Sequence, residues 1–311
     1  MKRILMLTIF IISMPVLAIS CDICGCGPGN NYIGILPEFQ KHIVGLRYRN
    51  NSMITHLGVG GINTPLTTKE QYNIAEAWGG WNITERIRIM ASVPYSFNSK
   101  ENQGVTETKN GIGDISILGF YEIINSRKTI INKNGKSRQL VQSLWIGGGT
   151  KLATGKYVAS DKSEANQSAN LFQLGTGSYD FNLNAMYDIR LQDAGINVSG
   201  NYKINTANKY DYQYGNKLNV NSQLYYKFRT KKDRMIAPNI GAQYEKSQQD
   251  WDETITVFAS GGYAVLGTVG VETAFSKYAV GANFQTPLSQ NLGNGIVKSK
   301  DRFMIHFSMA L

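Results

Sequence analysis

The chain has 311 residues, a formal net charge of +10 and a hydrophobic content of 42%. This length allows one large β domain or two smaller ones, and because no Pro-rich or Ser-rich linker divides the chain we predict one. A net positive charge often indicates a nucleic-acid partner. Here the first residues predict export of the chain, which excludes such a partner. Anionic lipid headgroups and anionic solutes are the expected partners of the positive charge.

Residues 1–18 are predicted to form a cleaved signal peptide. Lys2 and Arg3 precede an apolar run from residue 4 to residue 16, and Ala18 supplies a small residue at the cleavage position. Ser13 and Pro15 interrupt the run, which is shorter than the ~20 residues of a membrane-spanning helix. The segment is therefore expected to export the chain without anchoring it, and its loss leaves a charge of +8 (10 minus 2, for Lys2 and Arg3).

Residues 19–40 form a Cys/Gly-rich segment that contains CDICGCGPG and with it all three cysteines, Cys21, Cys24 and Cys26. Three closely spaced thiolates are soft ligands that suit Cu(I) or Zn²⁺, and the glycines allow a short loop to wrap an ion. Other interpretations remain open: a Cys21–Cys24 disulfide in an oxidising periplasm, a thiol that pairs with a periplasmic protein, or lipidation of Cys21.

From residue 41 to residue 311 the dominant pattern is strict alternation of apolar and polar residues. Between residues 87 and 97 the apolar set is Ile87, Ile89, Ala91, Val93, Tyr95 and Phe97. Residues 181–191, 196–204 and 218–228 alternate in the same way, over about ten residues each, which is the length of a tilted strand that crosses a bilayer. We expect strands near 41–54, 70–82, 86–97, 113–124, 139–152, 179–190, 195–205, 217–229, 235–246, 263–275, 278–287 and 302–311.

These segments predict an all-β fold, an antiparallel transmembrane β-barrel of about 12 strands within a range of about 10–14. An even number places both chain ends in the periplasm and the long connections at 98–112, 153–178, 206–216, 247–262 and 288–301 outside the cell. The last strand alternates up to Leu311. It resembles the terminal strand that the barrel assembly machinery reads, although such strands usually end in Phe.

A soluble exported β-sandwich would also show alternation. The membrane barrel is favoured by the strand lengths, by the last strand and by aromatic residues near strand ends. An apolar face spread over so many long strands also needs outer-membrane lipid, or a very large core, to cover it. The aromatic residues in question are Trp78, Trp81, Tyr95, Phe97, Tyr226 and Phe228.

Four further segments carry a family resemblance: GIGDISILGFYEI (111–123), LATGKY (152–157), QLGTGSYDF (173–181) and SGG (260–262). Together they resemble the outer-membrane β-barrel family named after the meta-pathway of phenol degradation, whose Bacteroidota members are labelled "transporter". The resemblance runs from about Arg47 to the end, and it implies the outer membrane of a Gram-negative bacterium and a transport role. Because these motifs consist mainly of glycines and turn residues, they report the fold and leave the substrate open.

Charged residues on the polar face of the strands are the candidate lining of the lumen. They indicate either a selective hydrated path or simple plugging of the barrel. The sequence contains no G-x-S-x-G, no H-E-x-x-H and no compact carboxylate pair, so we predict no enzyme activity. The lumen candidates are Arg86, Arg88, Arg190, Lys203, Lys227, Glu272 and His306.

The sequence thus predicts a passive channel, transporter or binding site for small solutes, with hydrophobic or aromatic compounds as one class of solute. The alternative is a structural or metal-handling barrel, for copper or zinc, that works through its N-terminal cysteine segment.

Overall fold

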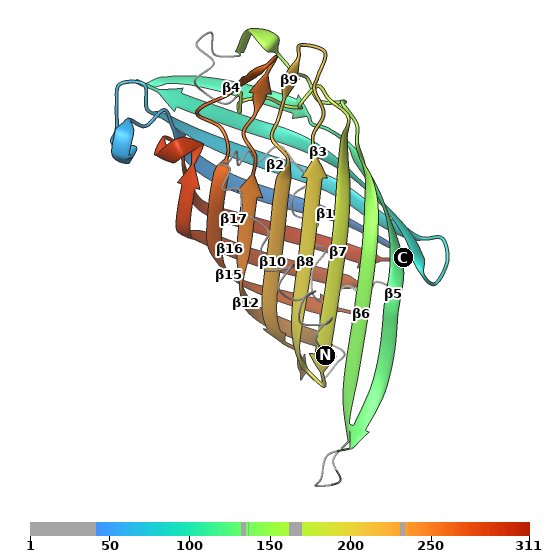
Figure 1. Ribbon diagram of the computed structural model, residues 1–311. Coiled ribbons are helices and arrows are strands. Elements are labelled where there is room, and N and C mark those ends of the chain that lie inside the picture. Colours follow the sequence, from blue (N-terminus) through green and yellow to red (C-terminus); the bar gives the residue numbers. More distant parts are fainter. Residues whose placement is uncertain (1–41, 132–134, 136, 162–169, 231–233) are drawn as a thin grey trace, which may run out of the picture.

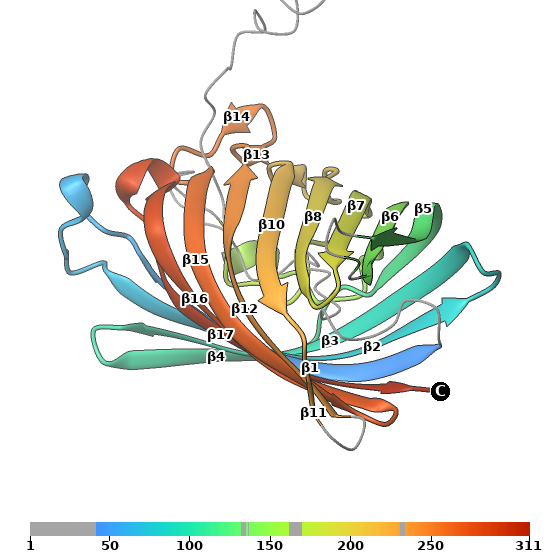
Figure 2. The ribbon, with the colours of Figure 1, turned by 90° about the horizontal axis from the view of Figure 1, so that it is seen from below.

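The computed structural model describes residues 42–131, 135, 137–161, 170–230 and 234–311. Within these residues twelve long strands form one antiparallel β-barrel (Figures 1 and 2). The predicted signal peptide and cysteine segment lie outside the described residues. The barrel strands are β1 (Ile43–Thr55), β2 (Thr68–Asn82), β3 (Ile87–Asn102), β5 (Ser116–Ile131), β6 (Ser137–Lys151), β7 (Asp180–Leu191), β8 (Ala194–Ile204), β10 (Lys217–Tyr226), β12 (Arg234–Ser247), β15 (Gly262–Phe275), β16 (Tyr278–Leu292) and β17 (Lys298–Ala310).

The ring is closed because each of these strands pairs with two neighbours. β1 pairs with both β2 and β17, and β10 pairs with both β8 and β12. The N–H of Leu311 donates to the carbonyl of His42 at 2.9 Å, so the first and last described residues lie at the same end. The predicted all-β class and the twelve strands are confirmed, and a closed ladder leaves no barrel edge exposed to lipid.

Five shorter strands and three 3₁₀ turns complete the described structure. β4 (Val105–Ile112) pairs with the outer half of β3, so the predicted loop at 98–112 is largely a hairpin. β9 (Tyr212–Gln213), β13 (Trp251–Asp252) and β14 (Ile255–Thr256) form a small separate sheet above the barrel (Figure 1). β11 (Phe228–Thr230) extends the β10 side of the ring, and the turns are Val59–Gly61, Ala159–Asp161 and Gly293–Gly295. No helix among the described residues has the length and hydropathy of a membrane span.

Alternation along the strands separates an apolar outer face from a buried inner face. On β17, Phe303, Ile305 and Phe307 point outward with 38–42% of their surface accessible, whereas His306 and Ser308 are each 2% accessible. The apolar set of residues 87–97 also points outward on β3. The predicted registers are therefore correct, and the outer face is suited to contact with lipid.

Aromatic side chains gather where the strands end. The rings of Tyr226 and Phe228 lie 4.6 Å apart between centroids, and Trp81 stacks on His42 at 4.8 Å. Such belts are typical of membrane–water interfaces. Trp78 differs from the expectation: it is only 7% accessible and points into the barrel, because it lies on the inward parity of β2.

Short turns and long connections lie at opposite ends of the barrel. Ser276 and Lys277 join β15 to β16, and Gln192 and Asp193 join β7 to β8, at the end where the described chain begins and finishes. The described parts of the long connections, residues 152–161, 170–179, 205–216 and 248–261, lie at the other end (Figure 1). In bacterial outer-membrane barrels the short turns are periplasmic and the long loops extracellular, so the first end is periplasmic and the second extracellular.

Candidate functional site

Half of the ring presents a cluster of large apolar side chains to the lumen, set among inward polar residues such as Arg88 and Asn184. Seven inward residues on β1, β2, β3, β5, β6 and β7 pack into one cluster, which we call the aromatic wall. All are at most 9% accessible. Because the outer face already meets lipid, an apolar cluster on the inner face is not required to hold the barrel in the membrane. The aromatic wall consists of Ile43, Trp78, Met90, Leu118, Phe120, Trp145 and Met186.

The glycine run after Trp145 makes room for part of the aromatic wall. A Cβ on Gly147 would lie 2.4 Å from Cδ1 of Phe120 and 2.4 Å from the carbonyl oxygen of Gly119. Only a glycine allows the Phe120 ring to lie flat over the neighbouring strand. This packing explains in physical terms why β6 has a glycine at position 147 despite its poor strand propensity.

The opposite half of the ring presents amides and a hydroxyl, which we call the amide wall. Nε2 of Gln223 donates to Oγ1 of Thr268 at 2.6 Å and to Oδ1 of Asn221 at 2.9 Å. Nε2 of Gln285 donates to Oε1 of Gln243 at 2.8 Å. The Gln223–Thr268 bond crosses from β10 to β15 and the Gln285–Gln243 bond from β16 to β12, so these two also brace the wall. The amide wall consists of Asn221, Gln223, Asn239, Gln243, Thr268 and Asn283.

Two buried ion pairs also line the interior. Arg47 contacts Glu76 at 2.7 Å, with Arg49 at 3.4 Å from the same carboxylate oxygen. Arg302 donates from both terminal nitrogens to Glu245, at 2.7 and 3.0 Å. Paired in this way, the charges are compensated where water is scarce.

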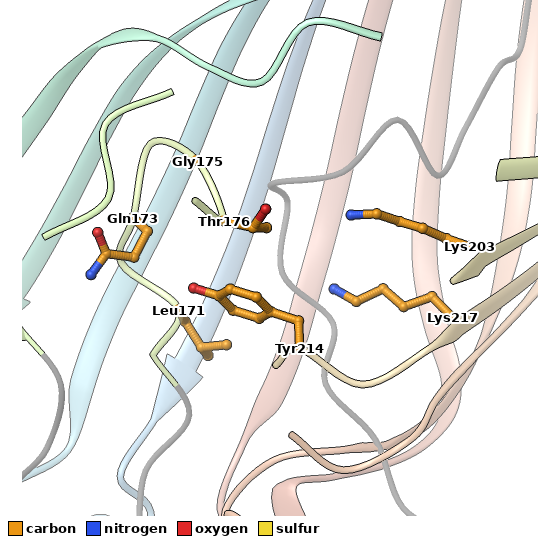
Figure 3. A pocket seen from close by; sticks show the side chains of 7 residues that line it. All are labelled: Leu171, Gln173, Gly175, Thr176, Lys203, Tyr214 and Lys217. Carbon is orange, nitrogen blue, oxygen red and sulfur yellow. The ribbon is translucent and has the colours of Figure 1, made fainter. Parts of the chain in front are cut away.

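Residues 170–178, which we call the inward loop, cross the interior from one side of the ring to the other. Leu171 and Phe172 pack against Met53, Tyr72 and inward residues of β15 and β16. At its other end the loop reaches Asp114, two residues before β5 begins. The inward loop therefore narrows the lumen below the extracellular opening (Figure 3).

Asp114 fastens three segments that are distant in sequence. Its Oδ1 accepts from the backbone N–H of Gly155 at 2.9 Å, and its Oδ2 accepts from the N–H of Thr176 at 2.9 Å and from Nζ of Lys151 at 2.5 Å. Lys151 also contacts Asp180 at 2.8 Å. The inward loop is thus held by a buried, charge-assisted network.

The close approach of two glycines lets this network form. A Cβ on Gly175 would lie 2.4 Å from Oδ1 of Asp114 and 2.7 Å from the Cα of Gly155. Any side chain at Gly175 would push the loop away from Asp114. The backbones at Gly155 and Gly175 can therefore meet only because both positions lack side chains.

The extracellular connections at 205–216 and 248–261 cover the inward loop. The hydroxyl of Tyr212 donates to Oδ2 of Asp250 at 2.6 Å, and the hydroxyl of Tyr214 donates to the carbonyl of Asn170 at 2.9 Å. Burial, followed by the neighbouring Asp250 carboxylate, raises the pKa of Tyr212 well above its usual value. The hydroxyl therefore stays protonated and keeps donating throughout the physiological pH range.

Residues 62–261 match the family model described as "Putative MetA-pathway of phenol degradation". The chain belongs to this family. Among solved structures it is similar to an outer membrane channel from Pseudomonas putida F1, with 12% identity and a TM-score of 0.63 over 91% of this chain and 99% of that chain. No curated protein matches the chain.

Two further structural neighbours are looser. The transport unit of the autotransporter AIDA-I from Escherichia coli gives 9% identity and a TM-score of 0.47, over 91% of this chain and 94% of that one. A Pseudomonas aeruginosa FadL homologue gives 8% identity and a TM-score of 0.41, over 87% and 90%. With its lipid-facing outer surface and its family, the chain is an outer-membrane β-barrel.

Three of the four sequence motifs that carry the family resemblance meet at the inward loop. GIGD supplies Asp114, LATGKY supplies Gly155, and QLGTGSYDF supplies Gly175, Thr176 and Asp180. Sequence reasoning treated these motifs as turn signals and did not select Asp114, Lys151 or Thr176. An aspartate directly after a glycine turn was the available signal, because such carboxylates often accept from nearby backbone N–H groups.

The predicted lumen residues occupy several different places. Arg88, Lys203, Glu272 and His306 point inward and are 1–2% accessible. Arg190 and Lys227 point inward near the periplasmic rim and are half-buried. Arg86 is exposed in the turn before β3, because that strand begins one residue later than the alternation suggested.

The predicted metal ligands Cys21, Cys24 and Cys26 lie outside the described residues. Within the described part of the chain, no group of three or more His, Cys, Asp or Glu residues is placed to hold a metal ion. The metal site at the cysteines stays a prediction.

Proposed function

We propose that the chain is a passive outer-membrane channel for small solutes that combine an apolar or aromatic body with a polar group. The observation that carries this proposal is the division of the lumen into an aromatic wall and an amide wall. Because the side chains of both walls are at most 9% accessible, a solute passes only where they move aside. Its ring then meets Trp145 and Phe120 while the amide wall offers hydrogen bonds to its polar end.

Two findings support the proposal further. The Pseudomonas putida neighbour is an outer membrane channel, and the family takes its description from phenol degradation. A channel for aromatic solutes would serve such degradation by moving its substrates across the outer membrane. The inward loop would then act as the constriction that limits solute size.

Swelling of liposomes that contain the purified chain tests the proposal. Phenyl-β-glucoside and methyl-β-glucoside share the same polar sugar, so only the ring distinguishes them, and both cross lipid slowly. We expect the phenyl compound to enter faster than the smaller methyl compound. A simple sieve would give the reverse order, and entry of neither compound would contradict a channel function.

A further inference from the structure

The hairpin of β5 and β6 extends further at the periplasmic end than the strands beside it. β5 and β6 stay paired as far as Ile131 and Ser137. The ladder between β3 and β5 ends at Tyr121, and the ladder between β6 and β7 ends at Leu140. The end of the hairpin therefore projects beyond its neighbours on both sides (Figure 1). We call residues 123–131 and 137–144 the projecting hairpin.

One edge of the projecting hairpin is uncovered. From residue 123 to residue 131, β5 pairs with β6 on one side, and no strand among the described residues pairs with it on the other. Along that side the backbone presents alternating N–H and C=O groups that point away from β6. An extended peptide adds to such an edge as a further strand. We call residues 123–131 the free edge.

Both faces of the free edge lie open to solvent. All of its residues except the half-buried Ser126 are exposed. Ile130 and Ile131 point to opposite faces and are 46% and 73% accessible. A segment that lies on a lipid surface gathers its apolar side chains on one face. The division of the isoleucines between two faces therefore favours a partner that meets the edge over one that meets a face.

The projecting hairpin also lacks the support that the rest of the sheet has. Its last three ladder pairs, from Thr129–Gln139 to Ile131–Ser137, belong to β5 and β6 alone. A two-stranded ribbon is only marginally stable in water, and a third strand adds a second ladder of hydrogen bonds. Binding of an extended segment along the free edge would therefore stabilise the hairpin.

The charge of the projecting hairpin indicates which kind of segment binds. It contains no Asp or Glu, and its charged residues are Arg127, Lys128 and Arg138. Antiparallel pairing of two copies of the free edge would bring the basic residues of one copy beside those of the other. Like charges placed opposite one another destabilise a strand pair, whereas opposite charges stabilise it. The same residues that oppose self-association thus attract an acidic strand.

We propose that the free edge is the docking strand for an acidic, extended segment of a periplasmic protein. The segment pairs with β5 through its backbone, places a carboxylate beside Lys128 and packs β-branched residues beside Ile124 and Ile130. Backbone pairing supplies the affinity in this mode of recognition, and the side chains supply the specificity. The proposal goes beyond the channel function, because docking requires neither an open lumen nor a solute.

Binding of synthetic peptides to the detergent-solubilised full chain tests the proposal. The probe is a fluorescent peptide of alternating valine and threonine with a pair of glutamates at its centre, and its control carries lysines in their place. We expect the glutamate peptide to bind at least about tenfold more tightly by fluorescence anisotropy, since each cross-strand charge pair changes from attraction to repulsion. Equal affinities would overturn the proposal, and so would failure of the glutamate peptide to bind.

Backbone methylation separates strand pairing from simple charge attraction. Methylation of every second backbone nitrogen of the glutamate peptide removes the donors along one edge and keeps both carboxylates. Two such peptides, one for each edge, cover both ways in which the peptide can face β5. We expect at least one of them to lose about tenfold or more in affinity, because its ladder cannot form. Full affinity of both would overturn the proposal.

Charge reversal locates the binding surface. Lys128→Glu should weaken the glutamate peptide by about three- to tenfold and strengthen the lysine peptide. Lys277→Glu is the matched control, because Lys277 is exposed in the turn between β15 and β16, on the opposite side of the ring. Heat-dependent gel mobility confirms that each variant is folded. Equal effects of the two variants would contradict the assignment to the free edge.

A shortened hairpin removes most of the free edge and keeps the barrel closed. Replacing residues 127–141 by Asn-Gly joins Ser126 to Gln142, which are ladder partners, through a sequence that favours a tight hairpin turn. We expect the shortened chain to keep the heat-dependent mobility and the glucoside swelling of the parent, and to bind the glutamate peptide at least about tenfold more weakly. Binding at the parent affinity would overturn the proposal and leave the channel function untouched.

Discussion

The two halves of the ring follow the same alternating pattern but place different chemistry inside the barrel. On β2–β7 the inward positions include Trp78, Phe120 and Trp145, whereas on β10–β16 they include Gln223, Gln243 and Asn283. Both sets are buried, and both lie behind the same kind of lipid-facing surface. The difference shows that lipid contact fixes which side chains face out, while the chemistry of the inner face is free to vary.

The largest expected effect is on the aromatic wall. Trp145→Ala should lower the free energy of unfolding by about 3–5 kcal/mol, because the removed ring leaves a cavity among packed neighbours. Ile146→Ala is the control on the outer face of the same strand, where acyl chains fill the space, and should cost well under half as much. Urea titration in lipid vesicles measures both. Similar losses for the two variants would show that the wall is not packed.

A smaller effect is expected at the ion pair beside the amide wall. Glu245→Gln leaves Arg302 with weaker acceptors and should cost about 1.5–3 kcal/mol. Combining it with Arg302→Gln should cost less than the sum of the two single losses, and the difference gives the coupling energy. Strictly additive losses would mean that the pair contributes nothing beyond its separate parts.

The amide wall itself should respond still less. Thr268→Val removes the acceptor for Nε2 of Gln223 and should cost about 1 kcal/mol, since Gln223 keeps its bond to Asn221. Thr273→Val changes the outward face of the same strand and should be neutral or slightly stabilising in lipid. If Thr268→Val proves neutral as well, water replaces the lost bond and the amide wall is hydrated.

The smallest effect is expected from the cysteines, which precede both walls in the sequence. Replacing Cys21, Cys24 and Cys26 by Ser should leave the free energy of unfolding unchanged, because a link that spans so few residues removes little chain entropy. The same change should abolish any stoichiometric binding of Cu(I) or Zn²⁺ by the reduced protein, measured by titration. A triple variant that fails to assemble would make the segment structural.

Alternation was sufficient to predict the barrel, its strands and its outer face. The residues between Ile87 and Phe97, for example, point as predicted because the period of a strand is two and lipid selects one face. The aromatic wall could not be predicted in this way. Trp78 and Phe120 are apolar residues at inward positions, and a single sequence does not distinguish such a residue from a break in the strand pattern.

The inward loop was harder still to predict. Its anchor joins Asp114 to Thr176, which are 62 positions apart, and no local period reports a contact of that kind. The motifs that meet there could be found in the sequence. The reason for glycine at Gly155 and Gly175 appears only in the structure, where the two backbones are in contact. Lys203 was selected as a lumen residue, whereas its ladder partner Lys217 on β10 was not.

The glucoside preference of wall variants tests the central claim most directly. If solutes travel along the aromatic wall, Phe120→Asn should reduce the ratio of phenyl-β-glucoside to methyl-β-glucoside entry from above one to below one in liposome swelling. Tyr121→Asn, the outward neighbour with 49% of its surface accessible, should leave the ratio unchanged. An unchanged ratio in folded Phe120→Asn would contradict the account, because the aromatic wall would then lie off the path of the solute.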